Sequence, residues 1–453
     1  MLLAVAAVLA VSAGSGAVDA FVRAEMERQK VPGVAVAIVR GGEVVKAQGY
    51  GLANVEHQVP VKPETIFQSG SVGKQFTAAA VMLLVEEGRL ALSDPVTRFF
   101  PDAPAGWAGI TVRHLLTHTS GIPDYTTDTL DYRRDYTEDE LAKLAYGLKL
   151  EFPPGARWNY SNTGYVLLGI VVGKVSGRFY GDLVAERVFR PLGMKTARVI
   201  SEEDIVPNRA AGYRLVDGVL KNQEWVAPKL NTTADGSLYL SVLDLVAWDR
   251  GLRAGAVLKA GSWDEVYAPV RLNSGKTYPY GFGWALEERG GETVRRHGGA
   301  WQGFKSEIAR FLGSDLTIVV LANLAEADPE RFTEGIASLL EPKLAKPKLV
   351  PIADAEPQVT ARLRELLAAA AKGELRPEDF AYVRAGFFPS GAKGLEATLA
   401  SLGSPTTVSP LRRIDLGDDR IHIYDVSYAT KAFRVALALA PDGKVAGLSV
   451  RPR

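Results

Sequence analysis

A proline-rich segment near the C-terminal end divides the chain into two folding regions. The segment EPKLAKPKLVPIADAEP occupies residues 341–357 and shows no hydrophobic periodicity, which is typical of a linker. A chain of 453 residues is also too long for a single compact core. We therefore expect one domain over residues 18–340 and a second, smaller domain over residues 358–453.

The segments before the linker alternate between helical and strand patterns. Residues 18–30 favour an amphipathic helix, and a Gly-Gly pair favours a hairpin turn between two apolar runs, 34–40 and 44–51. Apolar helical segments are expected at 73–86 and 163–176. This mixture predicts an α/β (α+β) domain with an antiparallel sheet flanked by helices.

The region after the linker has a simpler pattern. Residues 359–372 are rich in Ala and Leu and predict a helix, and alternating apolar and polar residues then predict strands. The strands are expected at 420–429, 432–440 and 444–450. We expect a small α+β domain with one helix on an antiparallel sheet, similar by analogy to the cone-shaped NTF2-like fold. Such a domain could cap an active site or mediate dimer contacts.

The first residues form an apolar segment. Residues 1–17, MLLAVAAVLAVSAGSGA, carry no charge and end in two small-x-small patterns that suit signal cleavage. The segment is short for a membrane span, which needs about 20 residues, so we expect export to the periplasm or the medium and no integral membrane span. The absence of Lys and Arg leaves two alternatives open, a mis-assigned start or a buried first helix.

Charge and cysteine content exclude several functions. The net charge is +1 and no long run carries one sign, so an electrostatic nucleic-acid surface has no support. The chain has no cysteine, which removes disulfides, thiolate nucleophiles and iron–sulfur clusters. We expect a small-molecule or peptide substrate, no cofactor and no nucleic-acid partner, and the oligomeric state stays open.

An S-x-x-K tetrad occurs twice. Ser71 and Lys74 stand directly before the apolar run QFTAAAVMLLVEE, which predicts a buried helix with Ser71 at its N-terminus and Lys74 on the same face. Burial strips an amine of its proton, so this lysine can activate the serine hydroxyl. The copy at Ser390 and Lys393 lies in a loop-like stretch and lacks this context. By position alone, a core serine with a snorkelling lysine remains an equal alternative.

Two further motifs change that balance. Tyr160 and Asn162 follow a Pro-Gly turn and precede an apolar helix, and a tyrosine whose pKa is lowered by nearby cations can transfer protons. Asn162 can orient Lys74 or hold a substrate amide. His297, Gly298 and Gly299 end a polar strand at 292–296, where glycines allow a substrate backbone to approach. Taken alone, His297 reads equally as a surface histidine.

The motifs S-x-x-K, Y-x-N and H-x-G, in this order and spacing, resemble those of the penicillin-recognising serine hydrolases. That superfamily holds class C β-lactamases, DD-carboxypeptidases, D-aminopeptidases and family VIII esterases. The resemblance covers about residues 20–340 and implies a β-lactamase/transpeptidase-like fold. Supporting stretches are HLLTHTSG at 114–121, FPPGARWNYSNTGY at 152–165, GSLY at 236–239 and YGFGW at 280–284.

The resemblance implies a role for each motif residue. Ser71 would be the nucleophile that forms an acyl-enzyme, while Lys74 and Tyr160 would share proton transfer, with the acylation base left open. Asn162 would contact substrate beside the H-G-G triplet. The backbone N–H groups of Ser71 and Ala300 would form the oxyanion hole, each contributing about 3 kcal/mol or more.

Two other motifs carry less weight. His114 and His118 have the spacing of zinc-binding histidines on a helix, but Leu115 replaces the glutamate and no third ligand is evident. We expect no metal and a structural role near the site. Lys276 begins a K-T-G-like triplet in which Tyr278 replaces glycine, and that side chain would block a strand-edge approach.

His297 bears on the substrate, because many relatives carry lysine at this position. A histidine near its reference pKa is mostly neutral at pH 7 and attracts a carboxylate weakly, unless Arg295 on the same strand face compensates. We place Arg295 in solvent. The prediction is hydrolysis of an amide or ester, such as a D-amino-acid peptide or a small ester. Alternatives are a β-lactamase or DD-carboxypeptidase and a non-catalytic penicillin-binding sensor.

Three aromatic residues are candidates for lining the substrate pocket, with core packing as the alternative: Tyr125, Trp158 and Trp301.

Overall fold

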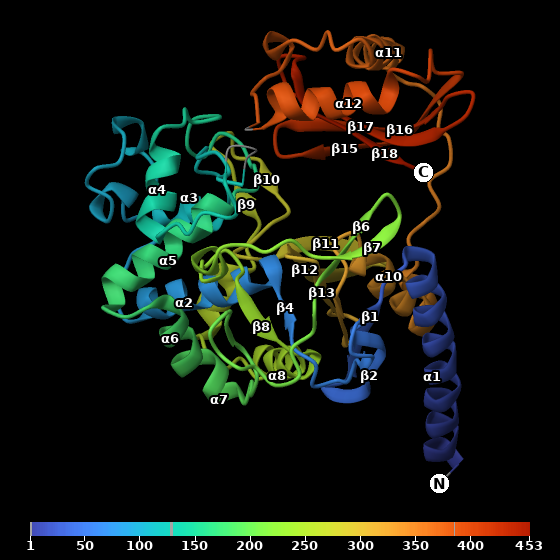
Figure 1. Cartoon of the computed structure of the whole chain (residues 1–453). Coiled ribbons are helices and arrows are strands. Elements are labelled where there is room, and N and C mark those ends of the chain that lie inside the picture. Colours follow the sequence, from blue (N-terminus) through green and yellow to red (C-terminus); the bar gives the residue numbers. More distant parts are fainter. Residues whose placement is uncertain (1, 127–129, 385) are drawn as a thin grey trace.

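The computed structural model describes residues 2–126, 130–384 and 386–453, with side chains from residue 16 onward. Figure 1 shows a large main region, residues 2–344, and a smaller C-terminal region, residues 357–453, joined by an extended connection. Separate hydrophobic cores lie in the two regions.

The helices of the main region, short 3-10 turns and the π-helical turn Ala185–Phe189 aside, are α1 (Leu2–Gln29), α2 (Lys74–Glu86), α3 (Val112–Leu116), α4 (Glu138–Tyr146), α5 (Asn162–Ser176), α6 (Tyr180–Val184), α7 (Arg190–Leu192), α8 (Val242–Arg253), α9 (Ala260–Val266) and α10 (Pro329–Leu340). Its strands are β1 (Gly33–Arg40), β2 (Glu43–Asn54), β3 (Val59–Pro60), β4 (Phe67–Gln68), β5 (Arg198–Val199), β6 (Tyr213–Val216), β7 (Val219–Asn222), β8 (Leu238–Leu240), β9 (Val270–Arg271), β10 (Thr277–Tyr278), β11 (Ala285–Arg289), β12 (Glu292–Trp301), β13 (Phe304–Phe311) and β14 (Leu316–Ala322).

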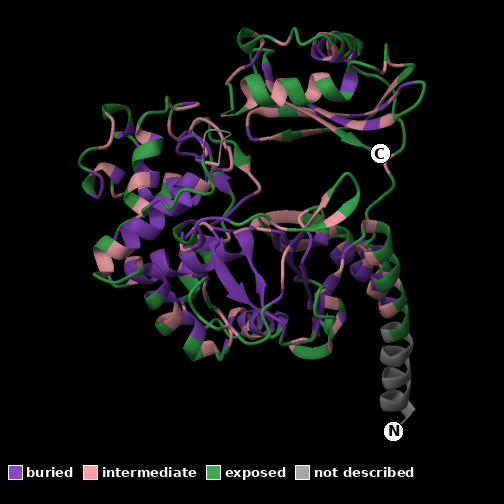
Figure 2. Ribbon diagram, in the orientation of Figure 1, coloured by how far each residue is buried: buried purple, intermediate pink, exposed green. Residues whose placement is uncertain are grey.

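A seven-stranded antiparallel sheet runs through the main region in the order β11-β12-β13-β14-β1-β2-β3. Its centre, β1 and β14, is buried on both faces, as its β-branched sequences favour. Helices α1 and α10 cover one face and α8 covers the other. Figure 2 shows this centre in purple. The sequence prediction of an antiparallel sheet flanked by helices is confirmed.

Two apolar helices form the second layer of the main core. Helix α2 is buried almost all round and packs against α5, which explains why both segments lack a polar face. Both were expected from the sequence, within a residue or two of the observed bounds. Between them and the sheet lies the turn that carries Ser71.

Helix α1 begins well before the expected amphipathic segment at 18–30. Its C-terminal half packs against α10, with Val18 and Val22 buried. The predicted export segment is residues 1–17. Met1 and the side chains of residues 2–15 lie outside the described set, so export stays a prediction. Within the described chain, no helix combines the length and apolar character needed to cross a membrane.

The C-terminal region is α+β, as expected, but richer than its sequence suggests. It contains α11 (Pro357–Ala371), α12 (Ala392–Leu399), β15 (Thr407–Leu416), β16 (Asp419–Ser427), β17 (Ala432–Leu439) and β18 (Val445–Pro452), with the strands paired in chain order. The expectation of a single helix is wrong, because α12 packs against α11. In Figure 1 both helices lie on the sheet face turned away from the main region. The likeness to an NTF2-like fold stays a prediction.

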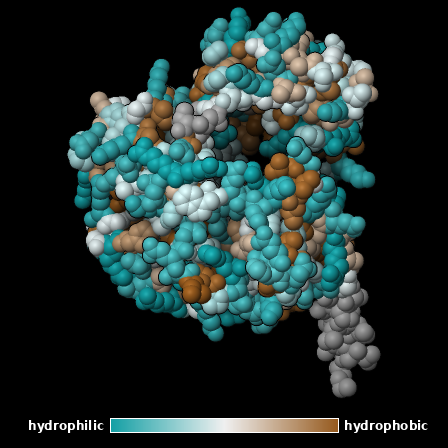
Figure 3. All heavy atoms as spheres, viewed as in Figure 1, coloured by the Kyte–Doolittle hydropathy of each residue, from teal (hydrophilic) through white to brown (hydrophobic). Residues whose placement is uncertain are grey.

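The face of the main region beneath the C-terminal region carries an apolar patch. The β6–β7 hairpin exposes Val216 and Val219, and Figure 3 shows this hairpin as a brown area.

The linker segment begins with a 3-10 turn, Pro342–Leu344, whose Leu344 is fully buried.

Candidate active site

Ser71 lies in a short 3-10 turn, Gly70–Gly73, between β4 and α2. Helix α2 starts at Lys74, so the serine stands one turn before the α-helix proper and not inside it. Lys74 is fully buried, while Ser71 stays partly exposed. The turn therefore presents the hydroxyl to solvent and keeps the amine in the core.

The Lys74 amine has three acceptors. Its Nζ lies 3.1 Å from Ser71 Oγ and 2.7 Å from Asn162 Oδ1, and it also donates to the backbone carbonyl of Asp235. Burial lowers the pKa of Lys74 to about 8, against the opposing charges of Asp235 and Asp124. About a tenth of this amine is neutral at pH 7, far more than in a lysine with the ordinary pKa.

Asn162 is oriented from behind. Its Nδ2 donates to Asp124 Oδ2 at 3.1 Å, and its backbone N–H donates to the same oxygen at 2.9 Å. The amide oxygen is thus turned toward Lys74. Of the two roles that the sequence left open, this geometry favours orientation of Lys74 over a grip on the substrate amide.

Tyr160 stands beside this group with its hydroxyl buried. The Lys74 Nζ lies 4.9 Å from the centre of its ring. Burial raises the pKa of Tyr160 well above its usual value, and the Ser71 hydroxyl offsets only part of that shift. The condition that nearby cations lower this pKa is not met, because loss of water around the phenol outweighs the nearby amine.

Close backbone packing around Ser71 requires glycines. A Cβ on Gly299 would stand 2.0 Å from the Ser69 carbonyl oxygen, and one on Gly70 would stand 2.3 Å from the Ala300 nitrogen. By contrast, a Cβ on Gly298 would meet only the Ser306 carbonyl oxygen, at 3.6 Å. The glycine at 299 therefore lets β12 lie against the nucleophile turn, which the sequence had attributed to substrate approach.

Strand β12 continues through the H-G-G triplet and does not end at residue 296 as expected. Its pairing with β11 stops at Arg296, while its pairing with β13 continues to Trp301. The β11-side edge from His297 to Trp301 is thus open. This edge brings Ala300, predicted to share the oxyanion hole, beside the turn that holds Ser71.

His297 is buried and part of a hydrogen-bonded chain. The backbone N–H of Ser161 lies 3.2 Å from His118 Nδ1, and His118 Nε2 lies 3.2 Å from the Tyr280 hydroxyl. That hydroxyl lies 2.9 Å from His297 Nε2, and His297 Nδ1 lies 2.6 Å from the Gly298 carbonyl oxygen. The chain joins the Y-x-N segment to the H-G-G strand.

The two ends of this chain determine the position of every proton in it. A backbone N–H only donates and a carbonyl only accepts, so His118 carries its proton on Nε2 and donates to Tyr280. Tyr280 then donates to His297 Nε2, and His297 carries its proton on Nδ1. Burial lowers the pKa of His118 well below its usual value and that of His297 to about 4. Both rings are neutral at pH 7.

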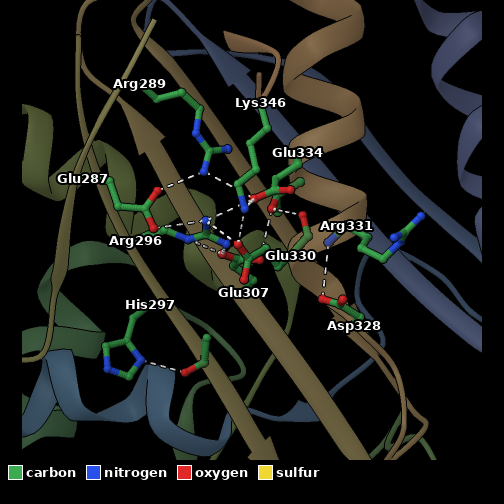
Figure 4. Close-up of polar contacts among 12 residues, drawn as sticks. Glu287, Arg289, Arg296, His297, Glu307, Asp328, Glu330, Arg331, Glu334 and Lys346 are labelled. Atoms are coloured by element: carbon green, nitrogen blue, oxygen red, sulfur yellow. Dashed lines mark hydrogen bonds and ion pairs between the residues drawn. The ribbon is translucent and has the colours of Figure 1, made fainter. Parts of the chain in front are cut away.

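The neighbours of His297 on β12 point elsewhere. Arg296 lies among buried and half-buried carboxylates, including Glu307, on the side away from the His297 ring, as Figure 4 shows. Arg295 stacks its guanidinium 3.5 Å from the centre of the Tyr267 ring and is half-buried. The expectation that Arg295 lies in solvent is wrong, because its guanidinium packs on the face of the Tyr267 ring.

The other sequence motifs are resolved by their surroundings. Ser390 and Lys393 are both exposed; Ser390 lies in a single helical turn, Phe387–Gly391, and Lys393 lies in the first turn of α12, not in a loop as expected. Burial therefore separates the two S-x-x-K copies. His114 accepts from the Thr111 backbone N–H at the N-cap of α3, whereas His118 belongs to the chain above. Among the described residues, no group of three His, Asp or Glu side chains is placed to hold a metal ion.

A small cavity opens beside Ser71. Asp235 lines it and was missed by sequence reasoning, which had noted only the following G-S-L-Y stretch. Of the three aromatic candidates, Tyr125 and Trp301 line the cavity, while Trp158 stacks on Tyr278 with ring centres 4.2 Å apart. The described lining consists of Gly70, Ser71, Tyr125, Thr126, Asn162, Asp235, Gly236, Ser237, Ala300 and Trp301.

The C-terminal region contacts the main region near the Tyr160 segment through the β15–β16 turn. Arg157 donates to Asp419 at 2.6 Å, and the Gly417 N–H donates to the Thr277 carbonyl at 3.2 Å. The Arg157 guanidinium also lies 5.2 Å from the centre of the Tyr382 ring. These contacts support the segment that leads into Tyr160.

Comparison with known proteins shows the family of the chain. The family model described as Beta-lactamase matches residues 18–341. Penicillin-binding protein 4* of Bacillus subtilis is 31% identical over 319 residues, which cover 66% of this chain and 70% of that protein. A D-aminopeptidase of Gluconobacter oxydans is 28% identical over 334 residues, which cover 72% of this chain but only 62% of that protein.

Solved structures share the fold. D-amino acid amidase from Ochrobactrum anthropi is 25% identical with a TM-score of 0.64, over 73% of this chain and 99% of that one. An octameric penicillin-binding protein homologue from Pyrococcus abyssi, 24% identical with a TM-score of 0.65, covers 97% of this chain and 98% of that one. The chain therefore belongs to the beta-lactamase family of hydrolytic serine enzymes, as the ordered motifs around Ser71 predict.

Proposed function

We propose that the protein hydrolyses an amide or an ester through an acyl-enzyme at Ser71. The observation that carries the proposal is the set of acceptors around Lys74 Nζ. A neutral amine has two N–H donors and one lone pair. Asn162 Oδ1 and the Asp235 carbonyl can only accept, so they take both donors and leave the lone pair facing Ser71 Oγ, 3.1 Å away.

Acylation then follows in balanced steps. The Ser71 hydroxyl gives its proton to Lys74 Nζ while Oγ forms a bond to the substrate carbonyl carbon, giving a tetrahedral oxyanion. Collapse of this intermediate breaks the bond to the leaving amine or alkoxide. The leaving group receives a proton from the pair formed by Lys74 and Tyr160. Water attacks the acyl-enzyme in the same way, and the acid leaves as Ser71 regains its proton.

The neutral Tyr160 phenol supports a donor role. Because burial raises the pKa of Tyr160, the free enzyme holds a protonated phenol beside an amine whose pKa is lowered to about 8. Lys74 is therefore the better base for acylation, and Tyr160 is suited to pass a proton to the leaving group, taking one back from Lys74.

The oxyanion would bind to the backbone N–H groups of Ser71 and Ala300. Gly70 packs against the backbone of Ala300, and Gly299 packs against the backbone of the turn that carries Ser71. This packing supports the pairing, because it holds the two N–H groups on adjacent segments. Two such donors in a water-poor site contribute about 3 kcal/mol or more each to transition-state binding.

The substrate class is drawn from the neutral histidine and from the relatives. A buried His297 with a pKa of about 4 offers no positive charge to a substrate carboxylate. Substrates that carry one, such as β-lactams and peptides with a free C-terminus, are therefore less favoured than uncharged amides and esters. Relatives carry the names D-aminopeptidase and D-amino acid amidase. We infer an amide or small ester with an uncharged or cationic acyl part.

The test combines covalent labelling with turnover. After incubation with a fluorophosphonate, intact mass followed by peptide mapping should place the adduct on Ser71, and p-nitrophenyl butyrate should be hydrolysed. Ser71→Ala should abolish both. Ser390→Ala, in the exposed S-x-x-K copy, is the matched control and should behave as wild type. An adduct elsewhere, or equal hydrolysis by Ser71→Ala, would refute the nucleophile, and labelling without turnover would indicate a sensor.

A further inference from the structure

We propose that the Asp235 carboxylate binds a positively charged ammonium group on the acyl part of the substrate. The inference rests on the proposed function, because it assigns a substrate class to the same cavity. It identifies the substrate as an amino-acid amide or ester, or a peptide, with a free amino group.

The charge of the cavity carries the argument. Among the described residues that line it, Asp235 is the single charged side chain, and the others are glycines, hydroxyl residues, Asn162, Ala300 and Trp301. The carboxylate is partly exposed, so a ligand can reach it. A cavity with this lining attracts a cation and repels a carboxylate.

The carboxylate of Asp235 is held in place but not saturated. Oδ2 accepts from the Tyr125 hydroxyl at 2.9 Å, and Oδ1 accepts from the Thr233 hydroxyl at 2.6 Å. A carboxylate has about four lone-pair sites, so about two remain for a ligand. Two fixed donors orient the group, as expected of a preorganised binding residue.

The position of Asp235 matches the chemistry of the reaction. An α-ammonium lies two bonds from the acyl carbon, so its partner must share the cavity with Ser71. Lys74 Nζ contacts both Ser71 Oγ and the Asp235 backbone carbonyl, which sets the two residues on either side of one amine. Asp235 and Ser71 line the same cavity, and the Asp235 carboxylate accepts from the hydroxyl of Tyr125, which lines it too.

Neighbouring charges strengthen the attraction. Asp124 lies behind Asn162, and Glu138 is close enough to Asp235 for that carboxylate to help raise the Glu138 pKa, chiefly raised by burial, to about 7. Lys74 is the described cation beside them, and it must lose its charge before it can accept the Ser71 proton. An ammonium ligand restores the charge balance, whereas an anionic ligand worsens it.

The test measures binding without turnover. In Ser71→Ala protein, calorimetric titration compares D-alaninamide with D-lactamide, which carries a hydroxyl in place of the ammonium at nearly the same size. We expect D-alaninamide to bind about 10 to 100 times more tightly, the range for a hydrogen bond to a charged group. Adding Asp235→Asn, which keeps the shape and removes the charge, should reduce this preference to about threefold or less.

A matched control and separate readouts keep the outcomes distinct. Asp182→Asn, an exposed carboxylate on α6, should leave the preference unchanged. Equal binding of the two amides in Ser71→Ala protein, or a preference that survives Asp235→Asn, would overturn the assignment. Since this titration needs no catalysis, failure of the proposed function appears separately, as absence of p-nitrophenyl butyrate turnover by the wild-type protein.

Discussion

The Tyr280 hydroxyl donates to His297 Nε2 across 2.9 Å, and this contact completes the hydrogen-bonded chain between the Y-x-N segment and the H-G-G strand. Tyr280 also accepts from His118, whose ring packs against Tyr160 with centres 4.3 Å apart. The direction of the chain follows from its two backbone ends. We regard His118 and Tyr280 as positioning residues that hold Tyr160 and the H-G-G strand in register.

Removal of the Tyr280 hydroxyl should disturb both ends of this chain. Tyr280→Phe leaves His118 Nε2–H and His297 Nε2 buried without partners, so we expect a loss of about 2 kcal/mol or more in the free energy of unfolding. A small displacement of Tyr160 should lower kcat/KM by about tenfold or more. Urea unfolding and p-nitrophenyl butyrate kinetics measure the two effects.

Tyr146→Phe is the control for this change. Tyr146 lies on α4 and packs its ring against Trp107. The Tyr146→Phe variant should therefore match wild type in both measurements. Unaltered stability and kinetics for Tyr280→Phe would contradict a positioning role.

The pH dependence of acylation should follow Lys74. With its pKa lowered to about 8 by burial, Lys74 is protonated below that pH and cannot accept the Ser71 proton. We expect kcat/KM for p-nitrophenyl butyrate to rise about tenfold per pH unit up to pH 8 and then level off. Ser71→Ala protein provides the blank for spontaneous hydrolysis. A profile that is flat between pH 6 and 9 would argue against Lys74 as the base.

Lys74→Arg supplies the complementary test. Arginine keeps the positive charge but does not lose its proton in this range. The variant should therefore fold and lack esterase activity at every pH, whereas activity retained in Lys74→Arg would assign the base to another group.

Two adjacent glycines should respond differently to the same substitution. A methyl group at Gly299 would stand 2.0 Å from the Ser69 carbonyl oxygen and 2.9 Å from the Ser71 nitrogen. Gly299→Ala should force β12 away from the nucleophile turn and lower kcat/KM by about 100-fold. Gly298→Ala, whose methyl group meets nothing nearer than 3.6 Å, should retain near-normal kinetics. The pair is compared with the same ester, and equal losses would refute this steric account.

The contact between the two regions should depend on Arg157. Its ion pair with Asp419 is largely shielded from solvent, with side chains 19% and 22% exposed, while Lys276 lies 3.5 Å from Asp418 and is 57% exposed. Arg157→Gln should weaken docking of the β15–β16 turn by about 1 kcal/mol, and Lys276→Gln should have almost no effect.

Hydrogen exchange at Gly417 reports this contact directly. Its N–H donates to the Thr277 carbonyl across the junction, so Arg157→Gln should accelerate exchange of that amide several-fold. Equal exchange rates in Arg157→Gln and Lys276→Gln would show that the ion pair does not hold the turn in place.

Several features of the C-terminal region escaped sequence reasoning for local reasons. Strand β15 contains Pro410 at an irregularity in its pairing with β16 and lies at the sheet edge, where proline is tolerated but obscures the strand pattern. Helix α12 is short and contains Gly394, which weakens a helical pattern. In both segments the neighbouring strand or helix decides the structure.

The sequence by itself determined the local elements and the motif residues. Helical and strand periodicities are short-range properties, so the sequence predicted α2, α5 and the β1–β2 hairpin, and the spacing of Ser71 and Lys74 placed them together. The tertiary structure decided what depends on burial and on contacts between distant segments. These are the raised pKa of Tyr160, the proton positions along His118, Tyr280 and His297, and the place of Asp235 in the cavity, because desolvation and long-range hydrogen bonds exist only once the chain has folded.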